Sequence, residues 1–228
     1  MNKEWSEKNK QIQILLGKET TYKDGIELLI EFRKELFEQI SQIVHVYPAE
    51  AFYQMPFVKV KGYQSKTLSY SIWHIFRIED IVAHTLIARD EQVLVTGDYQ
   101  KKICSPIITT GNELQGQDIA EFSKKANIKA LYEYAEEVML STNSILSKLE
   151  YSKMKIRYSD ADKERLVASG CVSPDENSIW LIDYWCDKNL YGLIKMSFSR
   201  HWIMHIEAMQ RIKNKLCRNA RKGVDPIA

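Results

Sequence analysis

The chain has 228 residues, which fits one domain, or at most one domain with additional short segments, rather than several domains. Hydrophobic residues make up 45% of it, enough for a sizeable core, and the low counts of 9 Gly and 5 Pro argue against an all-β protein. The 32 basic and 30 acidic residues nearly balance, which gives no electrostatic reason to expect nucleic acid or a membrane surface as partner.

The first predicted element is a short leading helix within residues 1–19, running from about Lys3 to Leu16. The second is a long helix that starts near Thr20 to Asp24 and fades near His45. Its mainly apolar stripe recurs with a period near 3.6 residues, and it consists of Ile26, Leu29, Ile30, Arg33, Leu36, Phe37, Ile40 and Val44. The segment from Phe52 to Ser65 contains Pro and Gly, so we expect a loop or an extended excursion there.

A third helix is predicted to begin near Thr67 and to end before Gly97, with apolar residues nearly all the way round. Such a helix belongs at the centre of a bundle rather than on its surface. A connection of about twenty residues comes next, longer than a simple helical hairpin requires, so we expect a crossover that spans the bundle. The next predicted helix runs from near Asp118 to about Leu149.

Another long connection, over residues 152–188, comes before the last long helix. A short helix is predicted at Asp160 to Ala168, and the Ser-Pro-Asp-Glu run at 173–176 predicts another helix start. The last helix is expected from Leu190 to about Lys215, with a kink near Gly192. Together these elements predict an all-α fold, a single-domain four-helix bundle over residues 1–228 with long crossover connections and extra short helices.

The stretch HWIMH contains two histidines, His201 and His205, that are four residues apart in a predicted helix. This spacing places both rings on one face, which otherwise carries apolar residues. Zinc metalloproteases place two histidines in the same way within HExxH. Here Trp202 stands where that motif has its Glu, and Glu207 points to roughly the opposite side of the helix. The pair is therefore either two metal ligands without that mechanism or two hydrogen-bonded core histidines.

A third ligand would favour a metal, because catalytic sites commonly use three protein ligands and leave one position open. His45 falls at a helix end, where we expect it to be exposed or capping. His74 lies in the central helix, and His84 lies ten residues further on, roughly 80° away around the helix. His74 is therefore the better third ligand.

These residues resemble a known family. The pattern SIWHIFRIEDI at residues 71–81, with RHWIMH far downstream at 200–205, is similar to the DinB-like superfamily of four-helix bundles, which includes YfiT-like proteins. The resemblance implies a metal bound by His74, His201 and His205, and it covers most of the chain. Residues 152–188 are an insertion that compact members of the family do not need, so we expect this segment to cover the site as a lid. The resemblance also implies a metal-dependent hydrolase or a thiol S-transferase that uses a low-molecular-weight thiol, with homodimer formation plausible.

Three imidazoles suit Zn or Ni, and also Fe or Cu, so the sequence predicts a divalent transition metal without choosing among them. We expect a metal-dependent enzyme acting on a small molecule. The alternative is a non-enzymatic, stress-related binding bundle with structural histidines. No general base is identifiable, and the catalytic residues therefore remain unassigned.

Other side chains near the histidines are interpreted more plainly. Arg77 is expected to pair with an acid rather than to face a substrate, and Arg200 lies about 100° off the ligand face. We expect surface or interhelical ion pairing from Glu79 and Asp80, and core packing from Trp73 and Trp202.

The sequence predicts neither a cysteine metal site nor a disulfide framework. The cysteines, which form no CxxC pair, are Cys104, Cys171, Cys186 and Cys217. Cys186 and Cys217 have no activating basic context, and we nominate no cysteine nucleophile. The charged N-terminus does not resemble a signal peptide, and no apolar run approaches membrane-spanning length. We therefore expect a soluble, cytoplasmic protein.

Overall fold

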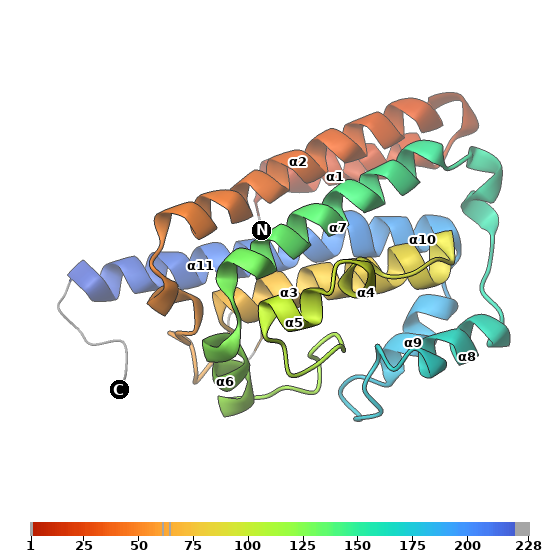
Figure 1. Cartoon of the computed structure of the whole chain (residues 1–228). Coiled ribbons are helices and arrows are strands. Elements are labelled where there is room, and N and C mark those ends of the chain that lie inside the picture. Colours follow the sequence, from red (N-terminus) through yellow and green to blue (C-terminus); the bar gives the residue numbers. More distant parts are fainter. Residues whose placement is uncertain (1, 61, 64, 222–228) are drawn as a thin grey trace.

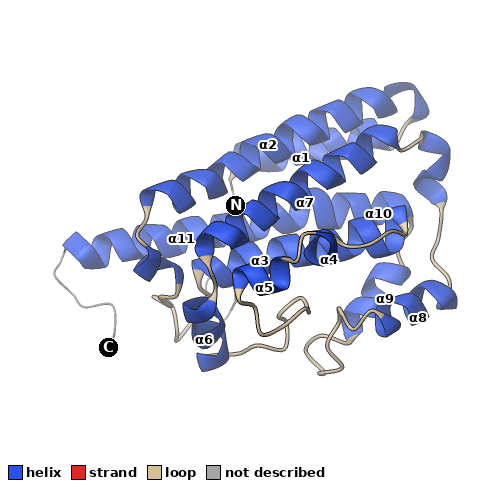
Figure 2. Cartoon of the chain, in the orientation of Figure 1, coloured by secondary structure: helices blue, strands red, loops and turns tan. Residues whose placement is uncertain are grey.

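The computed structural model describes residues 2–60, 62–63 and 65–221. Every extended regular element within these ranges is a helix, which confirms the all-α fold class (Figure 2). The α-helices are α1 (Lys3–Leu16), α2 (Tyr22–Val46), α3 (Leu68–Asp80), α4 (Val93–Thr96), α5 (Tyr99–Ile103), α6 (Gln117–Lys125), α7 (Ile128–Lys148), α8 (Asp160–Ala168), α9 (Trp180–Cys186), α10 (Leu190–Lys195) and α11 (His201–Arg221). Short 3₁₀ turns lie at Glu19–Thr21, Ala49–Phe52 and Tyr151–Lys155.

The bundle is formed by α2, α3, α7 and the rod that α10 and α11 make together. Helices α2 and α3 each pack against both α7 and α11, and α1 covers α2 (Figure 1). Helices α3 and α7 run in the same direction along the bundle, whereas α2 and α11 run in the opposite direction. This arrangement confirms the predicted four-helix bundle.

The two long connections differ in geometry. The connection at 89–127 must travel back along the bundle because α3 and α7 are parallel, so it is the predicted crossover (Figure 1). The connection at 149–189, which carries α8 and α9, leaves and returns at the same end of the bundle. There the Leu190 amide donates to the carbonyl of Ile156 at 2.9 Å. The expectation of a second crossover was therefore wrong.

Two predicted helical features were also wrong, each for a local reason. The helix expected from Asp118 to Leu149 is interrupted at Asn127, whose side chain accepts a hydrogen bond from the Ala130 amide and caps α7. The central helix, by contrast, ends at Ala88, before Gly97 as predicted, and is followed by Arg89 in the left-handed conformation with φ 60°. The helix start expected at 173–176 is instead a turn in which Asp175 accepts from the Asn177 amide at 2.8 Å.

Two π-helical segments interrupt regular α geometry within the bundle. One, Ile81–Ala88, continues α3, and the other, Met196–Arg200, joins α10 to α11 without a break. The last helix therefore departs from α geometry here and not at Gly192, which lies in the first turn of α10 and donates to Asn189 at 2.9 Å. Since an inserted residue rotates the rest of a helix by about 100°, the second π segment determines where His201 points.

A buried ion pair ties the four bundle helices together. Arg33 on α2 donates to both carboxylate oxygens of Glu79 on α3, at 2.8 and 2.6 Å. Arg33 also donates to Asn143 on α7, and Trp202 on α11 donates to Glu79 at 2.8 Å. Both charged side chains are fully buried, and the π-segment carbonyl of Phe198 accepts another Arg33 bond at 3.0 Å. This network confirms the interhelical role of Glu79 and holds α11 in register with α3.

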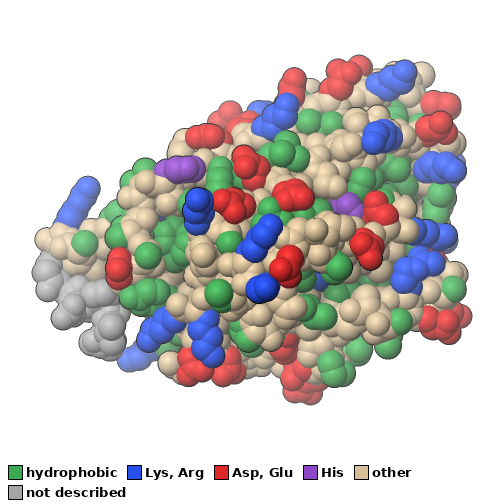
Figure 3. Space-filling model, in the orientation of Figure 1, with side chains coloured by type: hydrophobic (Ala, Val, Ile, Leu, Met, Phe, Trp, Pro, Cys, Tyr) green, Lys and Arg blue, Asp and Glu red, His purple; other side chains and the backbone are tan. Residues whose placement is uncertain are grey.

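The surface carries charges of both signs. On the face drawn in Figure 3, Lys and Arg are interspersed with Asp and Glu rather than gathered into one patch. Among the described residues, no helix has both the length and the apolar character that crossing a membrane requires.

Candidate metal centre

The bundle brings His74, His201 and His205 together in its interior. The ring centroids are 5.0 Å apart for His74 and His201, 4.7 Å for His74 and His205, and 4.5 Å for His201 and His205. One nitrogen from each ring can be chosen so that all lie within 4.8 Å of one another. All three side chains are buried, with exposures of 7%, 6% and 3%. The three residues singled out in the sequence thus form one cluster.

The crossover connection orients the His74 ring. The Thr110 carbonyl lies 2.9 Å from His74 Nδ1 and accepts its proton, which leaves Nε2 as the lone-pair nitrogen. The two preceding carbonyls are also held on α3, because Trp73 donates to Thr109 at 3.1 Å and Arg77 donates to Ile108 at 2.7 Å. Three successive contacts therefore fix the loop, and the loop fixes the tautomer that a metal ligand needs.

The other two histidines have ring nitrogens without partners. His201 Nδ1 and both nitrogens of His205 are buried and have no hydrogen bond with any described residue. A buried polar group left in this state costs about 1–3 kcal/mol. Native interiors rarely retain such groups without a reason, and the binding of an ion is one of the recognised reasons.

Burial keeps all three rings neutral at pH 7. Burial lowers the pKa of His74 to about 4, against the opposing effect of its bond to Thr110. Burial, and then the neighbouring imidazoles, hold the pKa values of His201 and His205 well below the ordinary histidine value. Neutral imidazoles keep a lone pair available, which is the form that coordinates a metal.

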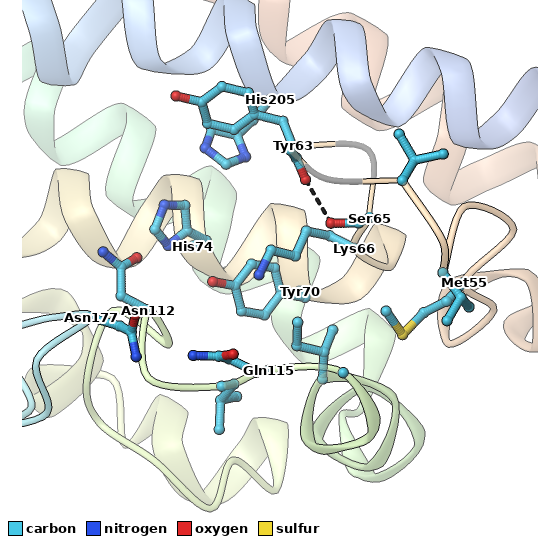
Figure 4. Close-up of a pocket in the computed structure, with 16 residues that line it drawn as sticks. Met55, Tyr63, Ser65, Lys66, Tyr70, His74, Asn112, Gln115, Asn177 and His205 are labelled. Carbon is cyan, nitrogen blue, oxygen red and sulfur yellow. Dashed lines mark hydrogen bonds between the residues drawn. The ribbon is translucent and has the colours of Figure 1, made fainter.

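Two cavities meet at the histidine cluster. The larger, of about 570 Å³, has His74 and His205 in its wall, together with Tyr63, Lys66 and Tyr70 (Figure 4). The smaller, of about 270 Å³, reaches all three histidines. The residues that line both cavities are Tyr63, His74, Asn112 and His205. A ligand at the cluster can therefore extend in two directions.

The insertion at 152–188 borders this site. Asn177 lines the larger cavity, and the start of α9, including Trp180 and Tyr184, lines the smaller one. Ser178 donates to Glu113 at 3.2 Å, and Glu113 in turn accepts from Thr109 on the crossover loop. The insertion thus forms a wall of the site, and whether it opens and closes as a lid stays a prediction.

The remaining histidines lie elsewhere, as the sequence indicated. His45 is exposed and its ring lies 2.8 Å from the Ser41 carbonyl. His84 lies between Asp90, at 2.6 Å from Nδ1, and Ser141, at 3.1 Å from Nε2. This order resembles a Ser–His–Asp triad, but Ser141 sits inside α7, where backbone amides are used by the helix and cannot stabilise an oxyanion.

The charged and aromatic neighbours of the ligands do not reach the site. Arg77 is fully buried, donates to Asp80 and to Gln92, and lines neither of the two cavities. Trp73 and Trp202 are core residues at 0% exposure, as expected. Arg200 is exposed and borders a separate surface hollow.

Glu207 does not take the place of the metalloprotease Glu, because it points away from the histidine cluster. Glu207 accepts from the Asn2 amide and lies 3.9 Å from Arg211. None of the cysteines contributes a nucleophile to the cluster either, since none lines the two cavities, and burial raises the pKa of Cys186 to about 11.

The sequence interpretation missed Thr110, Tyr63, Lys66 and Asn112. Thr110 acts through a backbone carbonyl, which leaves no trace in residue type. The other three lie in or beside irregular segments, where no periodicity predicts the direction of a side chain. A sequence signal was available for Lys66, because it directly precedes Thr67, the N-cap of the helix that carries His74.

A comparison with protein-family models finds no match to this chain, and a comparison with curated proteins finds no similar protein. The structure itself shows an all-α bundle with a buried cluster of three histidines.

Proposed function

We propose that His74, His201 and His205 bind a divalent transition-metal ion and that the protein is a metal-dependent enzyme acting on a small molecule. The observation that carries this proposal is the buried cluster itself, in which one nitrogen from each ring lies within 4.8 Å of the others. Nitrogens of His201 and His205 have no hydrogen-bond partner among the described residues, which adds to it. A metal would satisfy one nitrogen of each ring, and Thr110 already satisfies the remaining nitrogen of His74. Three neutral imidazoles suit Zn or Ni, with Fe as a further candidate.

The chemistry of the site would come from the metal that the three histidines hold. Such a metal would acidify a water molecule or hold a thiolate as a nucleophile, which would support hydrolysis or thiol S-transfer. The resemblance of SIWHIFRIEDI and RHWIMH to the DinB-like superfamily favours the same two reactions and a low-molecular-weight thiol as co-substrate. It also supports a homodimer, which light scattering on a sizing column would test.

The chain's own residues supply access and orientation. The larger cavity leads from the surface to His74 and His205, and the buried network of Arg33 and Glu79 keeps α3 and α11 fixed behind them. Neither cavity has an Asp or Glu among its described lining residues. The described lining residues of the two cavities therefore offer no carboxylate as a general base. This agrees with the sequence, in which Trp202 stands where the metalloprotease motif has its Glu.

Metal analysis of protein purified without a histidine tag tests the proposal. We expect stoichiometric Zn, Ni or Fe in the wild type and in the control His45→Ala, which removes an exposed histidine. The triple variant His74→Ala, His201→Ala, His205→Ala should hold none. A wild type that retains no metal after loading and dialysis would refute the proposal. Turnover by the loaded protein, with thiols plus electrophiles and with esters or amides, then separates the two reactions from a non-enzymatic bundle.

A further inference from the structure

The larger cavity has a single charged residue among its described lining residues. That residue is Lys66; the other described lining side chains are neutral, including the buried imidazoles of His74 and His205. The uncharged polar groups include the amides of Asn112 and Gln115. A cation alone in such a wall selects for negative charge in whatever occupies the cavity.

The Lys66 ammonium is held inside the cavity rather than in open solvent. It lies 4.8 Å from the centre of the Tyr70 ring, and Figure 4 shows its amine extending over that ring toward the space beside His74. Tyr70 itself is fixed, since its hydroxyl donates to the Gly111 carbonyl at 3.0 Å and its ring stacks on His74. Lys66 therefore packs on the same ring that supports a histidine of the cluster.

No carboxylate of the described residues pairs with this ammonium. The ion pairs found in those ranges do not include Lys66, and burial lowers its pKa. A partly desolvated cation without a counter-ion is costly, and an anionic ligand would offset that cost.

The opposite side of the cluster has a different character. The smaller cavity is walled by Trp180, Tyr184 and Trp185 from α9 and by Met196 and Met204, with no charged side chain among the described lining residues. Such walls take up an apolar or aromatic group. The two cavities meet at His74 and His205.

We propose that the substrate is a small amphipathic anion, whose negative group binds Lys66 and whose apolar group fills the aromatic cavity. The bond that reacts would then lie between these two groups, beside the three histidines. This inference rests on the proposed function, because the histidines define the reacting centre. Lys66 is thereby assigned as a residue that determines specificity.

Calorimetric titration with a matched pair of probes tests the inference. The charged probe is phenylmethanesulfonate, whose sulfonate is a poor metal ligand, and the neutral probe of similar shape is benzyl methyl sulfone. We expect the wild type to bind the sulfonate about tenfold more tightly than the sulfone, the value of one charge-assisted hydrogen bond. Lys66→Met should abolish this preference, and Lys66→Arg should retain part of it.

A second lysine provides the matched control. Lys124 also lies over a tyrosine ring, 5.8 Å from the centre of Tyr53, but it lines neither cavity. Lys124→Met changes the net charge equally and should leave the preference intact. Equal binding of both probes by the wild type, no binding of either, or a preference that survives Lys66→Met would overturn the inference. Metal content, measured on the same samples, reports separately on the proposed function, because the comparison can also be made on metal-stripped protein.

Discussion

Replacement of His205 by leucine should stabilise the metal-stripped protein instead of weakening it. Both ring nitrogens of His205 are buried without a hydrogen-bond partner among the described residues, and the side chain is 3% exposed. Leucine has a similar volume and no polar atoms, so the variant removes two unpartnered groups without opening a large void. An ordinary core histidine with satisfied nitrogens would show the opposite sign.

The magnitude depends on those two nitrogens. Each unpartnered buried group costs about 1–3 kcal/mol. Water from the adjoining cavities reduces the penalty, so we take the lower end and expect a net gain of about 1 kcal/mol. For a chain of this length, that gain raises Tm by about 2–4 °C.

Thermal unfolding in chelator and in added metal provides the assay. In chelator, His205→Leu should melt above the wild type. With added Zn or Ni the order should reverse, because only the wild type gains the stabilisation that a ligand bound to the folded state supplies, about 4 kcal/mol when the metal is at a thousand times Kd. His45→Leu, which alters an exposed ring, should behave like the wild type in both conditions. The reasoning would be refuted if His205→Leu melted below the wild type in chelator and added metal left the Tm of the wild type unchanged.

Three further predictions concern the bundle and its protonation. Arg33→Met should lower the free energy of unfolding in urea by about 3–5 kcal/mol, because it leaves the Glu79 carboxylate buried without its ion-pair partner. The double variant Arg33→Met, Glu79→Leu should recover most of that loss. Equal stability of the single and double variants would contradict the pairing. The metal-stripped protein should be most stable above pH 6.5 and lose stability as the pH falls toward 4, because the pKa of His74 is lowered to about 4 and only the unfolded state binds the proton. His74 alone contributes about 3 kcal/mol to this loss, and urea unfolding at several pH values measures it; a flat profile over this window would be inconsistent with a buried neutral ring. Asn127→Ala should cost about 1 kcal/mol because it removes the cap on the Ala130 amide, while Asn127→Asp should retain the cap and serve as the control.

Much of the fold can be predicted from local patterns. The stripe on residues 26–44 predicted α2, and the all-round apolar helix after Thr67 predicted a central position for α3, whose residues are all buried. Arg33 sits within that apolar stripe, but the stripe does not say which acid it meets. The partner, Glu79, is supplied by another helix, so the network could only be found once α2 and α3 were packed together.

The errors in the predicted helices come from hydrogen bonds that apolar periodicity does not report. At Asn127 and Asp175 a side chain bonds to a nearby amide and competes with the helix, and such competition is decided by small energies. The π segment at Met196–Arg200 is similar, because one of its carbonyls, that of Phe198, accepts from Arg33 on another helix. The periodicity of neighbouring residues does not indicate a hydrogen bond between two different helices.

The sequence by itself determined that the chain is helical and that His201 and His205 share a face, because the period of a helix depends only on residues one turn apart. It also favoured His74 over His84 as the third member of the cluster. Only the tertiary structure decided that the Thr110 carbonyl fixes the His74 ring, that α9 walls the smaller cavity and that Lys66 faces the histidines. These contacts join segments far apart in the chain, and they exist only because packing of the bundle brings those segments to one place.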